Sequence, residues 1–176
     1  MKRVLQLFLY SLGVGGIFFL HAVLFTIAPF PLNSINSIFV AMIWLMLYTN
    51  TARVLWLVIP FALLTEIFSS LPFGFQSIAL FTSLTIVNFL LVNFFTNRSV
   101  YIIFFIGLSS VFTYHVLLRF MLFVHSLITK TVFTLPRQML FSIMSEVLLT
   151  SLVLVLLYLL TARRLKRLNP TYLSSF

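Results

Sequence analysis

The chain contains no cysteine and no aspartate, and its only acidic residues are Glu66 and Glu146. Without cysteine it has neither disulfides nor thiolate chemistry. Only 7% of its 176 residues are charged, well below the roughly one-quarter found in a typical soluble domain. Zinc-peptidase and phosphate-loop motifs are absent, and so is any cluster of carboxylates suited to a metal. We therefore expect a protein that is not an enzyme and that holds no cofactor or metal.

The chain is instead rich in long apolar runs. Hydrophobic residues make up 62% of the sequence, and its mean hydropathy is +1.19. Continuous apolar runs of about 20 residues are typical of helices that cross a bilayer. We predict one all-α transmembrane domain over residues 1–176. Its helices are expected at about 4–28, 36–48, 54–68, 75–95, 100–128 and 138–160, followed by a basic cytoplasmic tail at 161–176.

The basic residues predict how this domain is oriented. The formal net charge is +9, and most basic residues flank the apolar runs. Eight fall on one side of the predicted membrane, two fall on the other, and Arg119 lies within the fifth helix. The positive-inside rule then places both termini in the cytoplasm. We attribute the charge to topology and to attraction of the lipid bilayer, with no nucleic acid as partner. The eight are Lys2, Arg3, Arg53, Arg98, Arg163, Arg164, Lys166 and Arg167, and the two are Lys130 and Arg137.

The stretch 66–74, read EIFSSLPFG, joins two of the apolar runs. Pro72 fixes its own φ, and Gly74 tolerates a positive φ, so the stretch predicts a tight reversal between antiparallel helices. Two roles are open for Glu66. Its carboxylate can stay hydrated and hold the hairpin to neighbours or partners. It can also cap the unpaired N–H groups that begin the next helix.

The last two predicted helices carry polar residues at helical spacing. His115 and Arg119 are four residues apart, and Ser142, Glu146 and Thr150 repeat every four residues, so each set shares one helix face. At a rise of 1.5 Å per residue, Arg119 and Glu146 each lie roughly 15 Å from the loop between the two helices. An unpaired charge at that depth is costly. We predict a buried Arg119–Glu146 ion pair, with His115 extending the network.

A serine-rich segment of the fifth helix raises an enzymatic alternative. Residues 107–110, read GLSS, are similar to the nucleophile segment of rhomboid-type intramembrane proteases. Such a serine needs a histidine from another helix within hydrogen-bond reach. His115 and His125 share the helix of Ser109, which leaves His21. We interpret the serines as small polar residues at a helix crossing.

A family resemblance rests on the central hairpin. The sequence ALLTEIFSSLPFGFQSIAL resembles the signature of the rod-shape-determining MreD family, in which a helix ends in Gly-x-x-x-Asp and Pro-Leu-Gly or Pro-Phe-Gly follows shortly. Here Ala62 stands at the glycine position and Glu66 at the aspartate position. Pro72, Phe73 and Gly74 match the family pattern.

The resemblance implies a non-enzymatic scaffold subunit of the bacterial cell-elongation complex, located in the inner membrane. Its expected partners are an MreC-like bitopic membrane protein and the peptidoglycan synthases of that complex. An alternative follows from the likeness of MreD-like proteins to the substrate-binding S-components of energy-coupling-factor transporters. A subunit of that kind would bind a small molecule in a polar cavity near the outer face. Candidate lining residues are His115, Arg119, His125, Glu146 and Glu66.

Overall fold

The described part of the chain is all-helical, which confirms the all-α part of the prediction. The computed structural model describes residues 32–48, 51–95, 99–131 and 136–168, together with 13, 15, 16, 19, 21–23, 26, 27, 29 and 30. Over these residues it contains helices and no strand. They are the 3-10 helix η1 (Leu32–Ser34) and the α-helices α2 (Ser37–Tyr48), α3 (Thr51–Ile67), α4 (Phe75–Asn93), α5 (Val100–Thr129) and α6 (Arg137–Leu168).

Three of these helices are long and apolar enough to cross a membrane. They are α4, α5 and the segment Arg137–Ala162 of α6, so the chain has the character of a membrane protein. α2 has 12 residues and α3 has 17, which at 1.5 Å per residue gives about 18 and about 26 Å, short of a hydrocarbon core about 30 Å thick. Of the predicted first helix, 4–28, most lies outside the described residues, and the described ones are helical.

Two predicted boundaries were wrong. α3 begins at Thr51, so Arg53 belongs to the helix and not to the preceding loop. α6 continues to Leu168, so the first eight residues of the expected cytoplasmic tail, 161–168, are helical. That segment reads TARRLKRL. Alanine, leucine, arginine and lysine are strong helix formers, so the helix persists after the apolar run has ended.

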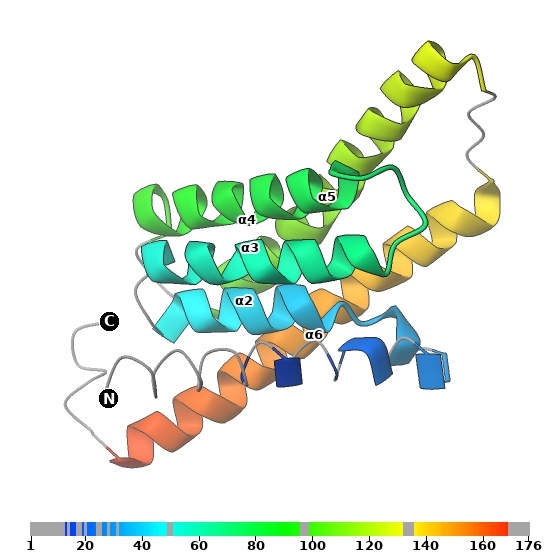
Figure 1. Cartoon of the computed structure of the whole chain (residues 1–176). Coiled ribbons are helices and arrows are strands. Elements are labelled where there is room, and N and C mark those ends of the chain that lie inside the picture. Colours follow the sequence, from blue (N-terminus) through cyan, green and yellow to red (C-terminus); the bar gives the residue numbers. More distant parts are fainter. Residues whose placement is uncertain are drawn as a thin grey trace.

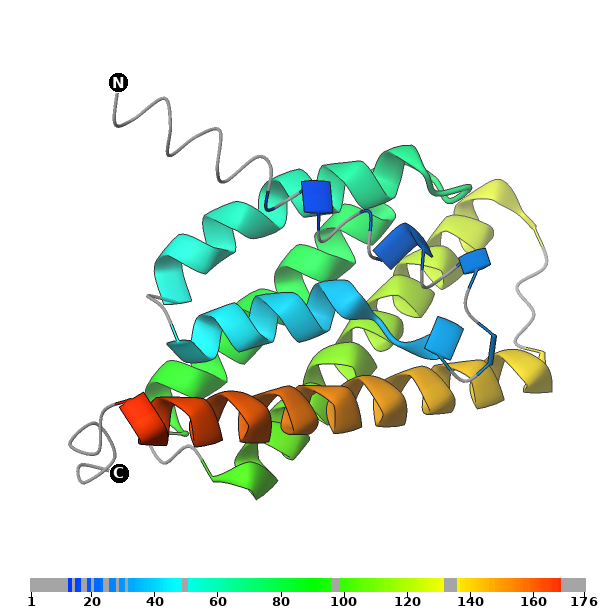
Figure 2. The same ribbon diagram turned by 90° about the horizontal axis from the view of Figure 1, so that it is seen from below.

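The helices pack around one apolar core. In Figure 1, α2, α3 and α4 lie nearly aligned, while α6 runs obliquely to them. Both ribbon views place α2 between α3 and α6, and α2 contacts both helices (Figures 1 and 2). α5 packs against α4 on one side and α6 on the other. The largest side chains that are fully buried include Phe39, Met42, Phe61, Leu84, Ile106 and Leu154.

α5 and α6 cross in close contact at Gly107. A Cβ atom added to this glycine would lie 3.0 Å from Cα of Ser151 and 3.2 Å from its Cβ. The hydroxyl groups at the crossing donate back to carbonyls of their own helices: Ser110 to Gly107 at 2.8 Å and Ser151 to Val147 at 2.6 Å. These bonds give both buried hydroxyls at the crossing an acceptor. Ser109 likewise donates to the carbonyl of Ile106, consistent with small polar residues at a helix crossing.

We predict that Gly107→Ala destabilises the protein by about 1–3 kcal/mol, because the added methyl group would meet backbone of α6 that cannot rotate away. The measurement is equilibrium unfolding in mixed detergent micelles. Gly15→Ala is the matched control, since a Cβ there meets nothing within 4 Å. Equal stability of the two variants would show that α5 and α6 are not in backbone contact.

Candidate functional site

Glu66 is the N-terminal cap of the following helix, α4. Its Oε1 accepts a hydrogen bond from the backbone N–H of Gly74 at 2.9 Å, and its Oε2 accepts one from the N–H of Ser77 at 2.7 Å. The Ser77 hydroxyl also lies within hydrogen-bond distance of Oε2. Gly74 holds the N-cap position with a φ of 95° and provides no side-chain cap of its own. A carboxylate borrowed from α3 therefore pairs N–H groups that otherwise have no partner inside α4.

This geometry decides between the two roles left open for Glu66. The residue is only 4% exposed, so the expectation of a hydrated carboxylate was wrong, and the expectation of a helix cap is confirmed. The physical reason is that the N-terminus of α4 supplies hydrogen-bond donors closer than solvent does. Pro72 closes the turn, because its carbonyl accepts from Phe75 N–H at 3.3 Å.

Ala62, at the position of the family glycine, lies on the same contact. It is buried at 4% exposure, and its carbonyl lies 3.1 Å from the Ser77 hydroxyl. A small side chain on α3 one turn before Glu66 thus allows α4 to approach. At the tip of the hairpin, by contrast, Phe73 is 80% exposed. Hydrogen bonds from Glu66 hold the base of the hairpin, while Phe73 at its tip faces outward.

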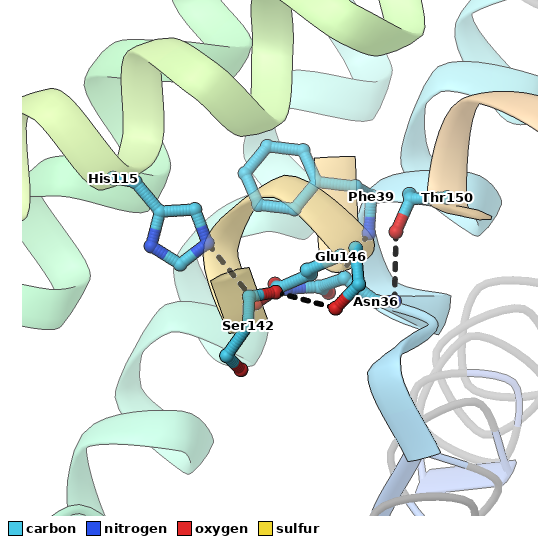
Figure 3. A network of polar contacts seen from close by, with 7 residues as sticks. Asn36, Phe39, His115, Ser142, Glu146 and Thr150 are labelled. Atoms are coloured by element: carbon cyan, nitrogen blue, oxygen red, sulfur yellow. Dashed lines mark hydrogen bonds and ion pairs between the residues drawn. The ribbon is translucent and has the colours of Figure 1, made fainter. Parts of the chain in front are cut away.

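Glu146 is the centre of a second polar group (Figure 3). Its Oε1 accepts from the Asn36 side-chain amide at 2.9 Å, and its Oε2 lies 3.0 Å from His115 Nε2. The backbone N–H of Asn36 donates to the Thr150 hydroxyl at 3.0 Å. The group joins the start of α2 to α5 and α6. The predicted stripe on α6 thus contributes Glu146 and Thr150, whose side chains face the residue that precedes α2.

The predicted Arg119–Glu146 ion pair was wrong. Among the described residues the ion pair of Glu146 is with His115. Arg119 is half-buried, and its Nε has no hydrogen-bond partner there. The prediction measured depth from the loop between α5 and α6, as if both helices ended at one level. Depth is set instead by the crossing at Gly107 and Ser151: Glu146 lies five residues from it, His115 eight and Arg119 twelve. His115 is therefore nearer to the level of Glu146.

The two ring nitrogens of His115 differ in their contacts. Nε2 faces the Glu146 carboxylate, whereas Nδ1 is buried with no hydrogen-bond partner among the described residues. One nitrogen of the ring is thus committed to Glu146, and the other is an unpaired polar atom.

A cavity of about 180 Å³ borders this group. It lies beside the start of α2, the first turn of α4, the middle of α5 and the third turn of α6. The lining residues are predominantly polar: His21, Asn33, Ser34, Ile35, Asn36, Gln76, Tyr114, His115 and Glu146. The small-molecule alternative expected a polar cavity, and one is present.

The predicted site residues divide between these two places. Glu66, Pro72 and Gly74 form the hairpin, and His115 and Glu146 line the cavity. Arg119, His125 and Glu66 were also proposed to line a cavity, but they are not among the residues that border this one. The ring of His125 instead packs edge-on against Phe75, with centroids 5.6 Å apart.

Sequence reasoning missed several cavity residues, of which Asn36 is the most important. The polar run 33–37 comes directly before α2, where such residues commonly cap a helix. Asn36 does lie in that role, with its Oδ1 3.5 Å from the N–H of Phe39, but its amide also binds Glu146 across 110 residues of sequence. Gln76 and Tyr114 gave no local signal, since single polar residues in apolar helices have many uses.

Comparison of the chain with protein-family models, curated proteins and solved structures found no match.

We predict that Glu66→Gln lowers the free energy of unfolding by about 2 kcal/mol, because an amide offers one acceptor oxygen where the carboxylate offers two to charge-assisted bonds. Thermal unfolding of the purified protein in detergent is the measurement. Ser70→Ala, an exposed change in the same turn, should stay within about 0.5 kcal/mol of the parent. If the Glu66→Gln variant is as stable as Ser70→Ala, the Glu66 carboxylate does not stabilise the protein by capping α4.

The polar group around Glu146 is testable by a double-mutant cycle. His115→Leu and Glu146→Leu should show a coupling free energy of about 1–3 kcal/mol, because the two side chains share a buried hydrogen bond. Arg119→Leu with Glu146→Leu is the matched cycle and should be nearly additive. Unfolding in mixed micelles measures the three single and two double variants. Stronger coupling through Arg119 than through His115 would contradict the observed pairing.

Proposed function

We propose that this chain is an MreD-like, non-enzymatic scaffold subunit of the bacterial cell-elongation complex, located in the inner membrane. In this role it binds an MreC-like bitopic protein and, with it, peptidoglycan synthases. The observation that carries the proposal is the α3–α4 hairpin, because the residues of the family resemblance, Glu66, Pro72 and Gly74, form one hydrogen-bonded unit.

The hairpin also explains how departures from the family pattern can be tolerated. Glutamate is one methylene longer than aspartate, yet its two oxygens pair with the N–H groups of Gly74 and Ser77. Ala62 in place of glycine is buried against the same contact. With both replacements, an acid can still cap the next helix, and that helix still has room to approach.

The proposal includes an orientation and a surface. Both termini lie in the cytoplasm, as the distribution of basic residues predicts, and the hairpin then lies on the outer side. There, the highly exposed Phe73 is the anchor for the MreC-like partner, since buried aromatic anchors dominate binding energies at interfaces. The test is a reporter that is active only outside the cytoplasm, fused after Phe176. Activity of this reporter would contradict the orientation.

The experiment is co-purification of the tagged chain with the MreC-like protein of the same cell. We expect Phe73→Ser to reduce recovery of the partner at least about tenfold, which is the effect of losing roughly 1.4 kcal/mol or more at an anchor. Trp56→Ser is the matched control: Trp56 is 75% exposed, but it lies within α3, away from the hairpin. The parent and the control should retain the partner, while both variants stay at normal abundance. Failure of the parent chain to recover an MreC-like protein would sink the proposal.

A further inference from the structure

We propose that the cavity beside Glu146 is a binding site for a small organic cation that carries a protonated amine. This site goes beyond the scaffold function and does not depend on it, since its residues are separate from the hairpin cap. The carboxylate of Glu146 is the group that receives the ammonium, and the polar side chains from η1, α4 and α5 surround the remainder of the ligand.

The charge of the cavity favours a cation. Of the nine described residues that line it, Glu146 is the only acid, and none is a lysine or arginine. The single carboxylate of the lining therefore attracts a positive group, and it does so more strongly in surroundings of low dielectric constant than in water.

The carboxylate also has hydrogen-bonding capacity left. A carboxylate accepts about four hydrogen bonds, whereas Glu146 accepts one on each oxygen, from Asn36 and from His115. Its side chain is 22% exposed, while that of His115 is 10% exposed. An ammonium group has three donors and no acceptor, which complements the free lone pairs of Glu146 and the oxygens of the surrounding amides and hydroxyls.

Arg119 offsets the negative charge of Glu146 only from a distance. It lies close enough to interact with Glu146 electrostatically, but it neither lines the cavity nor forms an ion pair with Glu146 among the described residues. Arg119 lies one turn beyond His115 on α5, so its positive charge would repel a second positive group of the ligand on that side. The preferred ligand is therefore a single amine with a polar, uncharged remainder.

The size of the cavity limits the ligand. A volume of about 180 Å³ is below the roughly 300–1,000 Å³ of pockets that hold drug-sized ligands. The ligand, or the part of it that enters, is thus a small amine such as ethanolamine. The same chemistry is available from a free amine or from the ethanolamine headgroup of a phospholipid.

The experiment measures the binding of ethanolamine to the full chain in nanodiscs made of phosphatidylcholine, by saturation-transfer NMR with titration to roughly 0.1 M, since ligands of few atoms bind weakly. Ethylene glycol and glycolate are the matched neutral and anionic probes. We expect ethanolamine to bind saturably and at least about tenfold more tightly than either. Absence of saturable binding, or equal binding of the three probes, would overturn the proposal.

Two variants locate the binding. Glu146→Gln keeps the shape and removes the charge, and should weaken ethanolamine binding about tenfold or more. Ser34→Leu fills the cavity from η1 without touching the Glu146 hydrogen bonds, so it tests the site even where Glu146→Gln fails to fold. Ser145→Ala, on the neighbouring half-buried residue of α6, should bind as the parent does. Unchanged binding in Ser34→Leu would place the amine elsewhere and refute the site.

A second set of nanodiscs containing phosphatidylethanolamine distinguishes the two sources. If the lipid headgroup occupies the cavity, free ethanolamine will bind more weakly in these nanodiscs, and Ser34→Leu will abolish that difference. If the ligand is a free amine, the affinity will be the same in both lipids. Either result keeps the cation site. Loss of binding of the MreC-like partner with retained amine binding, or the reverse, separates this inference from the scaffold proposal.

Discussion

A carboxylate in an apolar protein must be given hydrogen-bond donors, and this constraint shapes the two places where the helices of this chain are joined by polar contacts. Burying an ionised or polar group without partners costs several kcal/mol. Glu66 meets the requirement with the first N–H groups of α4, and Glu146 meets it with Asn36 and His115. Each acid therefore holds together helices that apolar packing by itself would allow to slide.

The two polar centres share the first turn of α4. Glu66 binds the backbone of Gly74 and of Ser77, and Gln76 lies between these two residues. Gln76 lines the cavity beside Glu146. The cap thus fixes the rotation and position of the turn that supplies one wall of the cavity. A partner docked on the hairpin and a small ligand in the cavity, the two occupants proposed above, would therefore meet the same turn.

The crossing of α5 and α6 determines which polar side chains can meet. The close contact at Gly107 and Ser151 fixes one level common to both helices. Beyond it the helices diverge toward the segment that connects them, as both ribbon views show (Figures 1 and 2). His115 lies close enough to the crossing to reach Glu146, whereas Arg119 is one turn farther along α5. Close packing at Gly107 and Ser151 therefore decides which residue pairs with Glu146, although neither of the two has a polar role between the helices.

The sequence by itself determined the all-α class, the approximate bounds of α2 to α5, and the hairpin, with Glu66 as a candidate cap that the structure then confirmed. These features follow from apolar run length and from Pro72, Gly74 and Glu66, which act over a few residues. Only the tertiary structure decided that Glu146 pairs with His115 and Asn36, and that Gln76 and Tyr114 reach one cavity with them. The reason is that hydropathy and helical periodicity describe each helix separately. Which side chains meet depends on the level and angle at which two helices cross, and those are set by close packing between residues far apart in the chain.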